Sequence, residues 1–467
     1  MMRHHVTPSL RRRLLAIVGS VTLTSLLLAP TAFAARPAAH PHDTVTITWL
    51  MRIDPNENPW ERAEVKGFEA ANPGIKINLI TAPNPNNGFD IKFNTLLQSG
   101  TPADIWSHLG QAGFADYYHR GLLLNLSPLI KSMNYNFGST PKNLINTYNI
   151  GGNIYGIPSI TLDSFLFYNK DIFDDYNKAH PNAKIAYPPV NWDDRSWTWD
   201  KMVNDAKLLT NPANHTYGLL ENLWPYMHWA WWASEDFWPK SSYQTGLPKK
   251  ANLLQPGIIK YVSLVANYES PKGLAISPPQ SLIRSIGNTG ADPFQFGNIA
   301  MGMTGGWGFR NFRPQRFHWA AAAIPWTPEQ LAKGGPRDTL FTDPYMVYKG
   351  TKHPQEVFKF IQYLTNSASM NSYIQNVGFT PSNPDYLGQW YSQYSKITGL
   401  SVEQLKTLVQ GGRKYGFESP NHLIVNFATI NQTLQQDFDP ILNGDKPVKA
   451  GLLQAQTDLN KILANTK

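Results

Sequence analysis

The chain has 467 residues, a formal net charge of +8 and no cysteine. The missing cysteines exclude disulfide bonds, thiolate metal sites and cysteine nucleophiles, so the fold must be stabilised by packing. Four of the 41 basic residues lie in the first 34 positions, and all 33 acidic residues come later, so the rest of the chain is only mildly basic. Its Lys and Arg residues are dispersed, which argues against a nucleic-acid partner.

Residues 1–34 have the pattern of a secretory signal peptide. A basic start at residues 11–13 precedes an apolar stretch at residues 14–28 and a small-residue cleavage site at residues 32–34. A membrane anchor is the alternative, but Thr, Ser and Pro residues interrupt the stretch, and no later run reaches the roughly 18 apolar residues of a membrane span. We therefore expect a protein that begins near Ala35, is secreted to the periplasm or the exterior without stable membrane insertion, and is not a lipoprotein, because no cysteine can carry a lipid.

Strand and helix patterns alternate after a Pro- and His-rich tether at residues 35–42. This β-α-β-α-β order predicts a parallel sheet with right-handed crossovers, in which ligands bind beyond the carboxyl ends of the strands. The expected strands are 45–50, 75–80 and 103–106, the expected helices are 60–71 and 91–98, and the loops at the carboxyl ends are 51–54, 81–82 and 107–111.

Two lobes are expected, because about 430 residues after the leader exceed the roughly 250–300 residues of a single core. Residues 153–168 have the pattern of a crossing into the second lobe, followed by a helix from Asp171. Later expected elements are a helix at 197–209 that buries Met202, Val203, Ala206 and Leu209, a strand at 344–348, a helix from Pro354 that buries Val357, Phe360, Ile361 and Leu364, and a last helix with Leu452, Ala455, Leu459 and Ile462 on one face.

Five of the fifteen tryptophans lie between Trp224 and Trp238. An indole face can cover the flat C–H patches of a pyranose ring, while nearby polar groups fix its hydroxyls. The alternative is that these rings fill a core, since large aromatic residues are highly buried on average. Because a proline and four acidic or amide residues are interleaved, we interpret the cluster as a cleft wall, although Trp229, Trp231 and Trp232 cannot all face one cleft.

Five stretches resemble, in family order, the family 1 extracellular solute-binding proteins of bacterial ABC importers, whose best-known members bind maltose and related oligosaccharides. The stretches are GFEAANPGIKI at 67–77, LLQSGTPADI at 96–105, YGIP at 155–158 with FYNKDIF at 167–173, AMGMTGGW at 300–307 and HPQEVFKFI at 353–361. They span nearly the whole chain after the leader.

The resemblance implies an α/β, two-lobe periplasmic-binding-protein fold. Each lobe is a mostly parallel sheet flanked by helices, the lobes exchange segments and are joined by a hinge, and the ligand is held in the cleft between them. The closed form docks on the membrane permease of an ABC importer. We expect residues 43–158 with 326–366 in the first lobe and residues 159–325 with 367–467 in the second.

The resemblance also suggests aromatic ligand contacts. Trp307 follows Gly305-Gly306 where the maltose binders place a Gly-Pro-Trp whose indole stacks on sugar, and glycine at Gly306 lets the backbone approach a ligand closely. The segment from Trp224 to Tyr226 resembles the Glu-Pro-Tyr sugar contact of the family, with Trp replacing a hydrogen-bonding Glu. Trp229 follows three positions beyond Tyr226.

Polar ligand contacts are expected in the loops of the cleft. Asp163 lies near an acidic contact of the maltose binders, although a helix cap or a hinge contact is an open alternative. Arg52 and Asp54 occupy the loop where the family places charged hydroxyl partners, although they could instead pair with each other on the surface. Three further candidates are His108 and Gln111, which stand where maltose binders have Asp-Arg, and Asp343 as a cleft acceptor.

Other functions remain as alternatives. A secreted glycoside hydrolase would need two carboxylates at a fixed gap, and the chain offers only sequence neighbours such as Glu235 and Asp236. The nucleophile-elbow, zinc-protease and nucleotide-binding motifs are missing, and His40 with His42 makes too few ligands for a metal. We therefore expect no enzyme activity, no cofactor and no metal, and a monomer that binds a carbohydrate, with a polyamine, glycerol phosphate or a peptide as alternative solutes.

Overall fold

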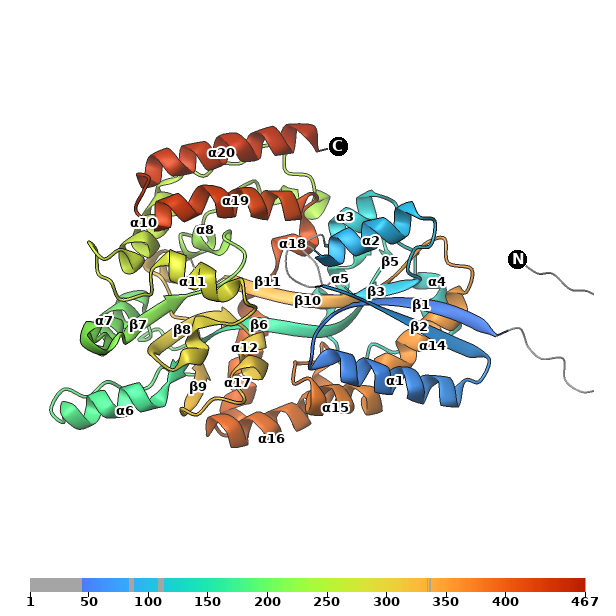
Figure 1. Ribbon diagram of the computed structural model, residues 1–467, viewed down its shortest axis with the longest axis horizontal. Helices are drawn as coiled ribbons and strands as arrows, with labels where there is room; N and C mark the ends of the chain where they lie inside the picture. The colour runs from blue at the N-terminus through green and yellow to red at the C-terminus, as the bar shows by residue number, and fades with distance from the viewer. Residues whose placement is uncertain (1–43, 84–87, 108–112, 334, 336, 467) are drawn as a thin grey trace, which may run out of the picture. The chain divides into compact units, whose positions relative to one another are not determined.

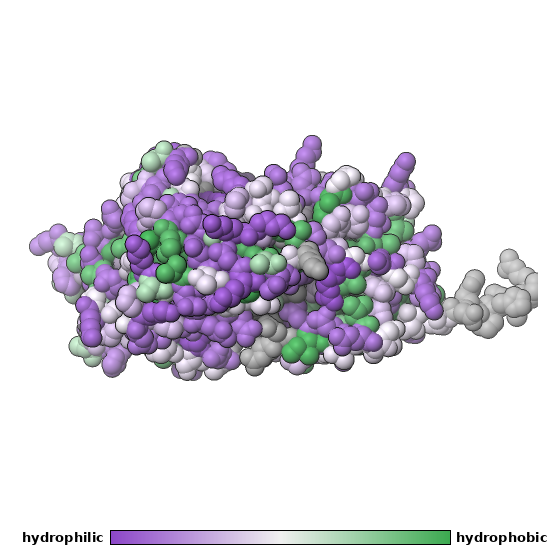
Figure 2. Space-filling view, turned by 90° about the horizontal axis from the view of Figure 1, so that it is seen from above, coloured by the Kyte–Doolittle hydropathy of each residue, from purple (hydrophilic) through white to green (hydrophobic). Residues whose placement is uncertain are grey.

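The computed structural model describes residues 44–83, 88–107, 113–333, 335 and 337–466. The expected signal peptide and tether lie outside these residues, and so do His108 and Gln111. Within the described ranges, no helix combines the length and the apolar character that crossing a membrane requires. The face seen in Figure 2 is mostly hydrophilic, with hydrophobic residues in small scattered groups.

The first part of the sheet is parallel, as the alternating patterns predict. The strands β1 (Val45–Arg52), β2 (Ile75–Ala82) and β3 (Ile105–Ser107) lie in the order β2-β1-β3, and both pairings are parallel. The helices α1 (Glu57–Ala71) and α2 (Gly88–Gln98) connect them. The β-α-β-α-β prediction is therefore confirmed, and the carboxyl ends of β1 and β3 point toward the centre of the sheet (Figure 1).

Two long strands, β6 (Ile157–Asn169) and β10 (Asp338–Val347), cross between the two halves of the sheet. The first half of β6 pairs antiparallel with β10, which also pairs with β3. The second half of β6 pairs with β8 (Ile299–Gly305) and β9 (Trp319–Ala322), and β7 (Tyr217–Glu221) lies parallel to β8. A continuous hydrogen-bonded path β2-β1-β3-β10-β6-β8-β7 thus joins both halves (Figure 1).

Buried side chains form two cores. The first core draws on residues 47–162 and 341–379, and the second on residues 165–324 and 374–463. The change from one core to the other falls between Leu162 and Phe165, in the middle of β6. The fold is therefore α/β with two lobes, and β6 and β10 form part of the hinge between them.

Helices cover both halves of the sheet, and their buried faces follow the apolar spacing of the sequence. The helix α7 (Trp199–Leu209) is capped by Thr198, whose side chain accepts from the backbone N–H of Lys201. It buries the four residues expected from its pattern. The helix α14 (Pro354–Leu364) likewise buries its four expected residues.

The other elements complete the two lobes. The remaining helices are α3 (Phe114–His119), α4 (Ser127–Ser132), α5 (Lys142–Asn146), α6 (Lys170–Ala179), α8 (His228–Trp232), α9 (Ser241–Thr245), α10 (Pro256–Glu269), α11 (Gln280–Gly287), α12 (Trp307–Asn311), α13 (Pro328–Lys333), α15 (Ser367–Asn376), α16 (Leu387–Thr398), α17 (Val402–Tyr415), α18 (Pro420–Leu423), α19 (Phe427–Leu442) and α20 (Val448–Asn465), and the remaining strands are β4 (Asn149–Ile150), β5 (Asn153–Ile154) and β11 (Gly416–Glu418).

Replacing Gly218 of β7 by Ala should destabilise the second lobe. A Cβ atom at this position would lie 1.9 Å from the backbone oxygen of Ala206 in α7, so strand and helix would have to separate. We expect Gly218→Ala to lower the free energy of unfolding by about 1–3 kcal/mol, measured by urea denaturation. The control is Gly287→Ala at the end of α11, where nothing lies within 4 Å of the added Cβ. Equal denaturation midpoints for the two variants would contradict the close packing.

Candidate functional site

Trp307 is the first residue of α12 and lies between the two lobes. The helix follows β8, a strand of the second half of the sheet, and the indole lies directly over Gly305. The half-buried ring nevertheless packs against the first core, with its centroid 5.2 Å from that of Phe341 in β10. Trp307 is therefore not enclosed within one lobe.

Trp224 meets the same phenylalanine. Its ring stacks on Phe341 at a centroid distance of 5.8 Å and an interplanar angle of 19°, and it packs against both cores. Its Nε1 donates to Oδ1 of Asn431 in α19 at 3.1 Å. Trp224, Phe341 and Trp307 thus form an aromatic trio, in which both indoles keep part of their surface exposed while Phe341 is buried.

Phe341 is the member of the aromatic trio that the sequence analysis missed. The expected strand began at Pro344, whereas β10 begins at Asp338, and its register shifts between Asp343 and Pro344. A proline after six residues of the strand gave the appearance of a strand start. The only sequence signal for Phe341 was its place directly before Thr342 and Asp343.

The glycines beside Trp307 have a packing role. A Cβ atom at Gly306 would lie 2.9 Å from the carbonyl oxygen of Asp163, and one at Gly308 would lie 2.7 Å from the ring of Phe167. Glycine at these positions lets the start of α12 lie directly against β6. Gly306 was expected to allow close approach to a ligand, but in this structure it allows close approach to the backbone of β6.

Asp163 lies in β6 where one core gives way to the other. Its Oδ2 is 3.8 Å from Nε of Arg413 in α17, and the helix approaches closely because a Cβ at Gly412 would lie 2.9 Å from the Asp163 Cβ. Burial raises the pKa of Asp163 to about 7, and Arg413 opposes that shift. The contact with α17 corresponds to the hinge contact that the sequence left open as an alternative.

Most of the tryptophan cluster fills the second core. The exposed fraction does not exceed 2% for the four residues Trp229, Trp231, Trp232 and Trp238. The interleaved acids point inward, because Glu221 accepts from the Trp229 indole at 2.9 Å and Asp236 accepts from the Trp231 indole at 2.8 Å. The interpretation of the cluster as a cleft wall, and of Trp229 as a ligand contact, is therefore wrong for these four rings, and only Trp224 takes part in the aromatic trio.

Tyr226 is directed away from the aromatic trio. Its hydroxyl accepts from Arg284 at 2.6 Å, and its ring packs on Trp229 and on Phe438 of α19. Phe438 lies about two helical turns beyond Asn431, the α19 residue that Trp224 contacts. The structure thus places Trp224 and Tyr226 about two turns apart along α19.

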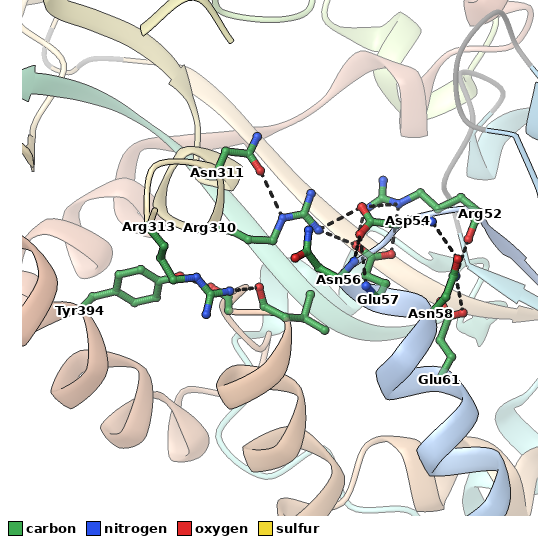
Figure 3. Close-up of polar contacts among 12 residues, drawn as sticks. Arg52, Asp54, Asn56, Glu57, Asn58, Glu61, Arg310, Asn311, Arg313 and Tyr394 are labelled. Carbon is green, nitrogen blue, oxygen red and sulfur yellow. Dashed lines mark hydrogen bonds and ion pairs between the residues drawn. The ribbon is translucent and has the colours of Figure 1, made fainter. Parts of the chain in front are cut away.

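Arg52 and Asp54 belong to a network that also contains Glu57 and Arg310 (Figure 3). Arg52 makes a two-point contact with the carboxylate of Glu57, with Nε 3.1 Å from Oε2, and lies 4.0 Å from Asp54. Asp54 Oδ1 accepts from the backbone N–H groups of Asn56 and Glu57 at the start of α1. We call these four charged side chains the Arg310 network. Its members are largely buried, so the alternative of a simple surface pair is wrong.

Electrostatics in the Arg310 network favour the charged form of Asp54. Burial by itself would raise the pKa of Asp54, but Arg310, Arg52 and two backbone hydrogen bonds outweigh it and lower that pKa below its usual value. Glu61, one helical turn after Glu57, differs, because its burial raises its pKa to about 8 although Asn58 donates to it at 2.8 Å. It lines a cavity of about 20 Å³ beneath the network.

Asp343 is two residues beyond Phe341 and therefore lies on the same side of β10. Its Oδ1 is 3.6 Å from Nε2 of His422, whose Nδ1 is 2.6 Å from Oε1 of Glu418. Burial raises the pKa values of Asp343 and Glu418 to about 8 and lowers that of His422 to about 3. These shifts favour the uncharged forms of all three side chains near neutral pH.

Two adjoining cavities border the polar chain of Asp343, His422 and Glu418. One of about 570 Å³ is lined by Glu418, Leu340 and Phe417, and one of about 530 Å³ is lined by His422. Tyr243 lines both. Within the described ranges, no group of three or more acidic or histidine side chains has the arrangement of a metal site.

The sequence matches a known protein family. The sequence profile of the family described as bacterial extracellular solute-binding protein matches residues 54–371. The chain belongs to this family. This solute-binding protein is 26% identical over 347 residues to a binding protein of Brucella abortus (strain 2308), covering 70% of this chain and 73% of the other.

Further matches link the sequence and the fold to named proteins. A maltooligosaccharide ABC transporter solute-binding lipoprotein of Streptococcus pneumoniae (strain R6) is 23% identical, with 84% of this chain and 85% of the other covered. The ABC substrate-binding protein Lmo0181 of Listeria monocytogenes, solved in complex with cycloalternan, superimposes with a TM-score of 0.72 at 20% identity, covering 91% of this chain and all of the other. The two-lobe fold expected from the sequence is therefore confirmed.

The buried Glu61 should make the stability of this solute-binding protein depend on pH. Its pKa of about 8 in the folded state exceeds the usual 4.5, so the unfolded chain binds fewer protons and stability falls as pH rises from about 4.5 to about 8. We expect Glu61→Gln to make that fall shallower by up to about 1.4 kcal/mol per pH unit, measured by urea denaturation across this range. The exposed Glu403→Gln is the control, and equal slopes for both variants and the natural protein would contradict the burial effect.

Proposed function

We propose that this solute-binding protein captures a carbohydrate, an oligosaccharide, against the aromatic trio and delivers it to the permease of an ABC importer. The observation that carries the proposal is the meeting of Trp224 and Trp307 at Phe341. The two indoles follow different strands, β7 and β8, and each keeps an exposed part. A sugar ring that covers such indole faces removes apolar surface from water without needing a charge.

Two further observations support a neutral, hydroxyl-rich ligand. One is the polar chain of Asp343, His422 and Glu418, whose shifted pKa values favour uncharged forms that can donate and accept hydrogen bonds without favouring an ion. One relative is named as a maltooligosaccharide ABC transporter solute-binding lipoprotein, and a similar structure was solved in complex with cycloalternan. Trp224, Trp307 and Asp343 are therefore the proposed ligand contacts, with His108 and Gln111 as further candidates outside the described residues.

The remaining expectations on location and assembly are part of the same proposal. Residues 1–34 act as an export leader, and the protein functions as a monomer outside the cytoplasmic membrane. The pneumococcal relative is a lipoprotein, whereas this chain has no cysteine and would be free of a lipid. No catalytic role is proposed, and release of reducing ends from an oligosaccharide would instead favour the glycoside hydrolase alternative.

The lobe boundaries are also proposed. The change of core between Leu162 and Phe165 supports a division close to residue 158. The second segment of the first lobe was expected to end at residue 366. Met370 and Phe379 also pack with the first core, which favours an end nearer to residue 379. The segment from 326 onwards would still be exchanged between lobes, because β10 runs from one half of the sheet to the other.

A thermal-shift panel tests the ligand class. We expect maltotriose to raise the unfolding temperature, because a ligand at 100 times its dissociation constant stabilises the native state by about 2.7 kcal/mol. Glycerol phosphate and spermidine should leave it unchanged. A shift with spermidine or glycerol phosphate alone would favour those alternative solutes over a sugar.

The variant Trp307→Ala should bind maltotriose about a hundredfold more weakly. One indole face covers on the order of 100 Å² of apolar surface, which is worth roughly 2.5 kcal/mol. Isothermal titration calorimetry measures the affinity, and unchanged thermal unfolding shows that the fold is intact. The variant Trp307→Phe should recover part of the affinity, and Trp238→Phe, which changes a buried core ring, should keep it. Equal affinities for Trp307→Ala and the natural protein would remove Trp307 from the site.

A further inference from the structure

Arg310 lies on the same short helix as Trp307, three positions further on. Residues three apart on a helix project to the same side, so the indole and the guanidinium are carried as one unit. The start of this helix is held against β6 by the close contact at Gly306. A movement of α12 would therefore shift Trp307 and Arg310 together.

The guanidinium of Arg310 reaches the segment between β1 and α1, more than 250 positions earlier in the chain. Its Nη1 donates to Oδ2 of Asp54 and to Oε1 of Glu57, each at 3.1 Å (Figure 3). Its Nε donates to Asn311, and its central carbon lies 4.2 Å from the ring centroid of Phe379. Arg310 thus joins the helix that follows β8 of the second half of the sheet to the loop that follows β1 of the first.

The charges in the Arg310 network balance only when Arg310 contacts the group formed by Arg52, Asp54 and Glu57. Arg52 already donates to the Glu57 carboxylate, and Asp54 Oδ1 accepts from two backbone N–H groups at the start of α1. Asp54 Oδ2 therefore remains to accept from Arg310. Without Arg310, one excess negative charge would remain on side chains that are at most 12% exposed. An unpaired charge at such burial costs more than an exposed pair is worth.

We propose that Arg310 is a positioning residue for ligand binding, which latches the helix of Trp307 to the opposite lobe through Asp54 and Glu57. The latch holds the two lobes together and fixes the indole over the ligand position. In the open form Arg310 would be solvated, and the negative charge of Asp54 and Glu57 would be balanced by Arg52 alone. Closure therefore carries an electrostatic contribution that is separate from the stacking contribution of the sugar. Because its role in binding rests on the proposed function, the latch is tested first without any ligand.

The ligand-free test measures the distance between the lobes. The chain has no cysteine, so Ser132→Cys in α4 and Lys207→Cys in α7 give two unique labelling positions, both exposed and on helices at opposite ends of the molecule (Figure 1). We expect Arg310→Gln to lower the energy transfer between the two dyes. We expect 1 M NaCl to lower it in the natural protein, because salt screens the attraction between the solvated Arg310 of the open form and the opposite carboxylates. Arg310→Lys should recover part of the transfer.

The matched control is Arg316→Gln, which removes the same charge from an exposed position of the loop after α12. It should keep both the energy transfer and the salt response of the natural protein. If Arg310→Gln also keeps both, Arg310 is not a latch. A purely structural role would not change the salt response, so this readout separates the latch from a loss of packing.

The ligand arm measures maltotriose kinetics by stopped-flow intrinsic fluorescence. We expect Arg310→Gln to raise the dissociation rate roughly tenfold while the association rate changes little, since truncating a partly buried charge pair acts mainly on dissociation. Equal dissociation rates for Arg310→Gln and Arg316→Gln would overturn the role in binding. If the natural protein binds no maltotriose, that result counts against the proposed function, and the ligand-free test still decides the latch.

Discussion

The antiparallel pairing of β6 with β10 is the interaction on which the arrangement of the site depends. Its register sets Phe341 opposite Leu162 and Leu340 opposite Asp163, at the point where the buried residues of β6 change from one core to the other. Phe341 therefore lies at the edge of the first core. Because β7 and β8 end beside this point, the indoles that follow them meet on the same phenylalanine, and a site is formed from three distant parts of the chain.

The early parallel sheet could be predicted because it depends on local information. The 3.6-residue and two-residue periods of the apolar side chains determine which face is buried, and the Gly and Pro residues between them mark the turns. The same reasoning located α7 and α14, whose apolar stripes are regular. The β10 start could not be predicted in this way, because Pro344 lies within the strand at a register shift and resembles a boundary.

The tryptophan cluster shows why side-chain type does not determine side-chain direction. Glu221 and Asp236 made Trp229 and Trp231 look like part of a polar cleft. A buried indole needs an acceptor for its N–H group, and a carboxylate from the same segment supplies it. An aromatic cluster with interleaved acids is thus compatible with a satisfied core, and the choice depends on packing partners such as Phe438 that come more than 200 residues later.

The charge balance around the aromatic trio bears on the class of ligand. Arg52 and Arg310 are matched by Asp54 and Glu57, so this part of the site carries no net charge to attract an ion. Asp343, with a pKa of about 8, is largely protonated at neutral pH and acts as a hydroxyl-like donor instead of an anion. A polyamine would need several ionised carboxylates beside the rings, and a phosphate would need unpaired cations. Among the described residues around the aromatic trio, the charged groups are already paired, and a neutral ligand held by stacking and hydrogen bonds fits this electrostatic environment better than either ion.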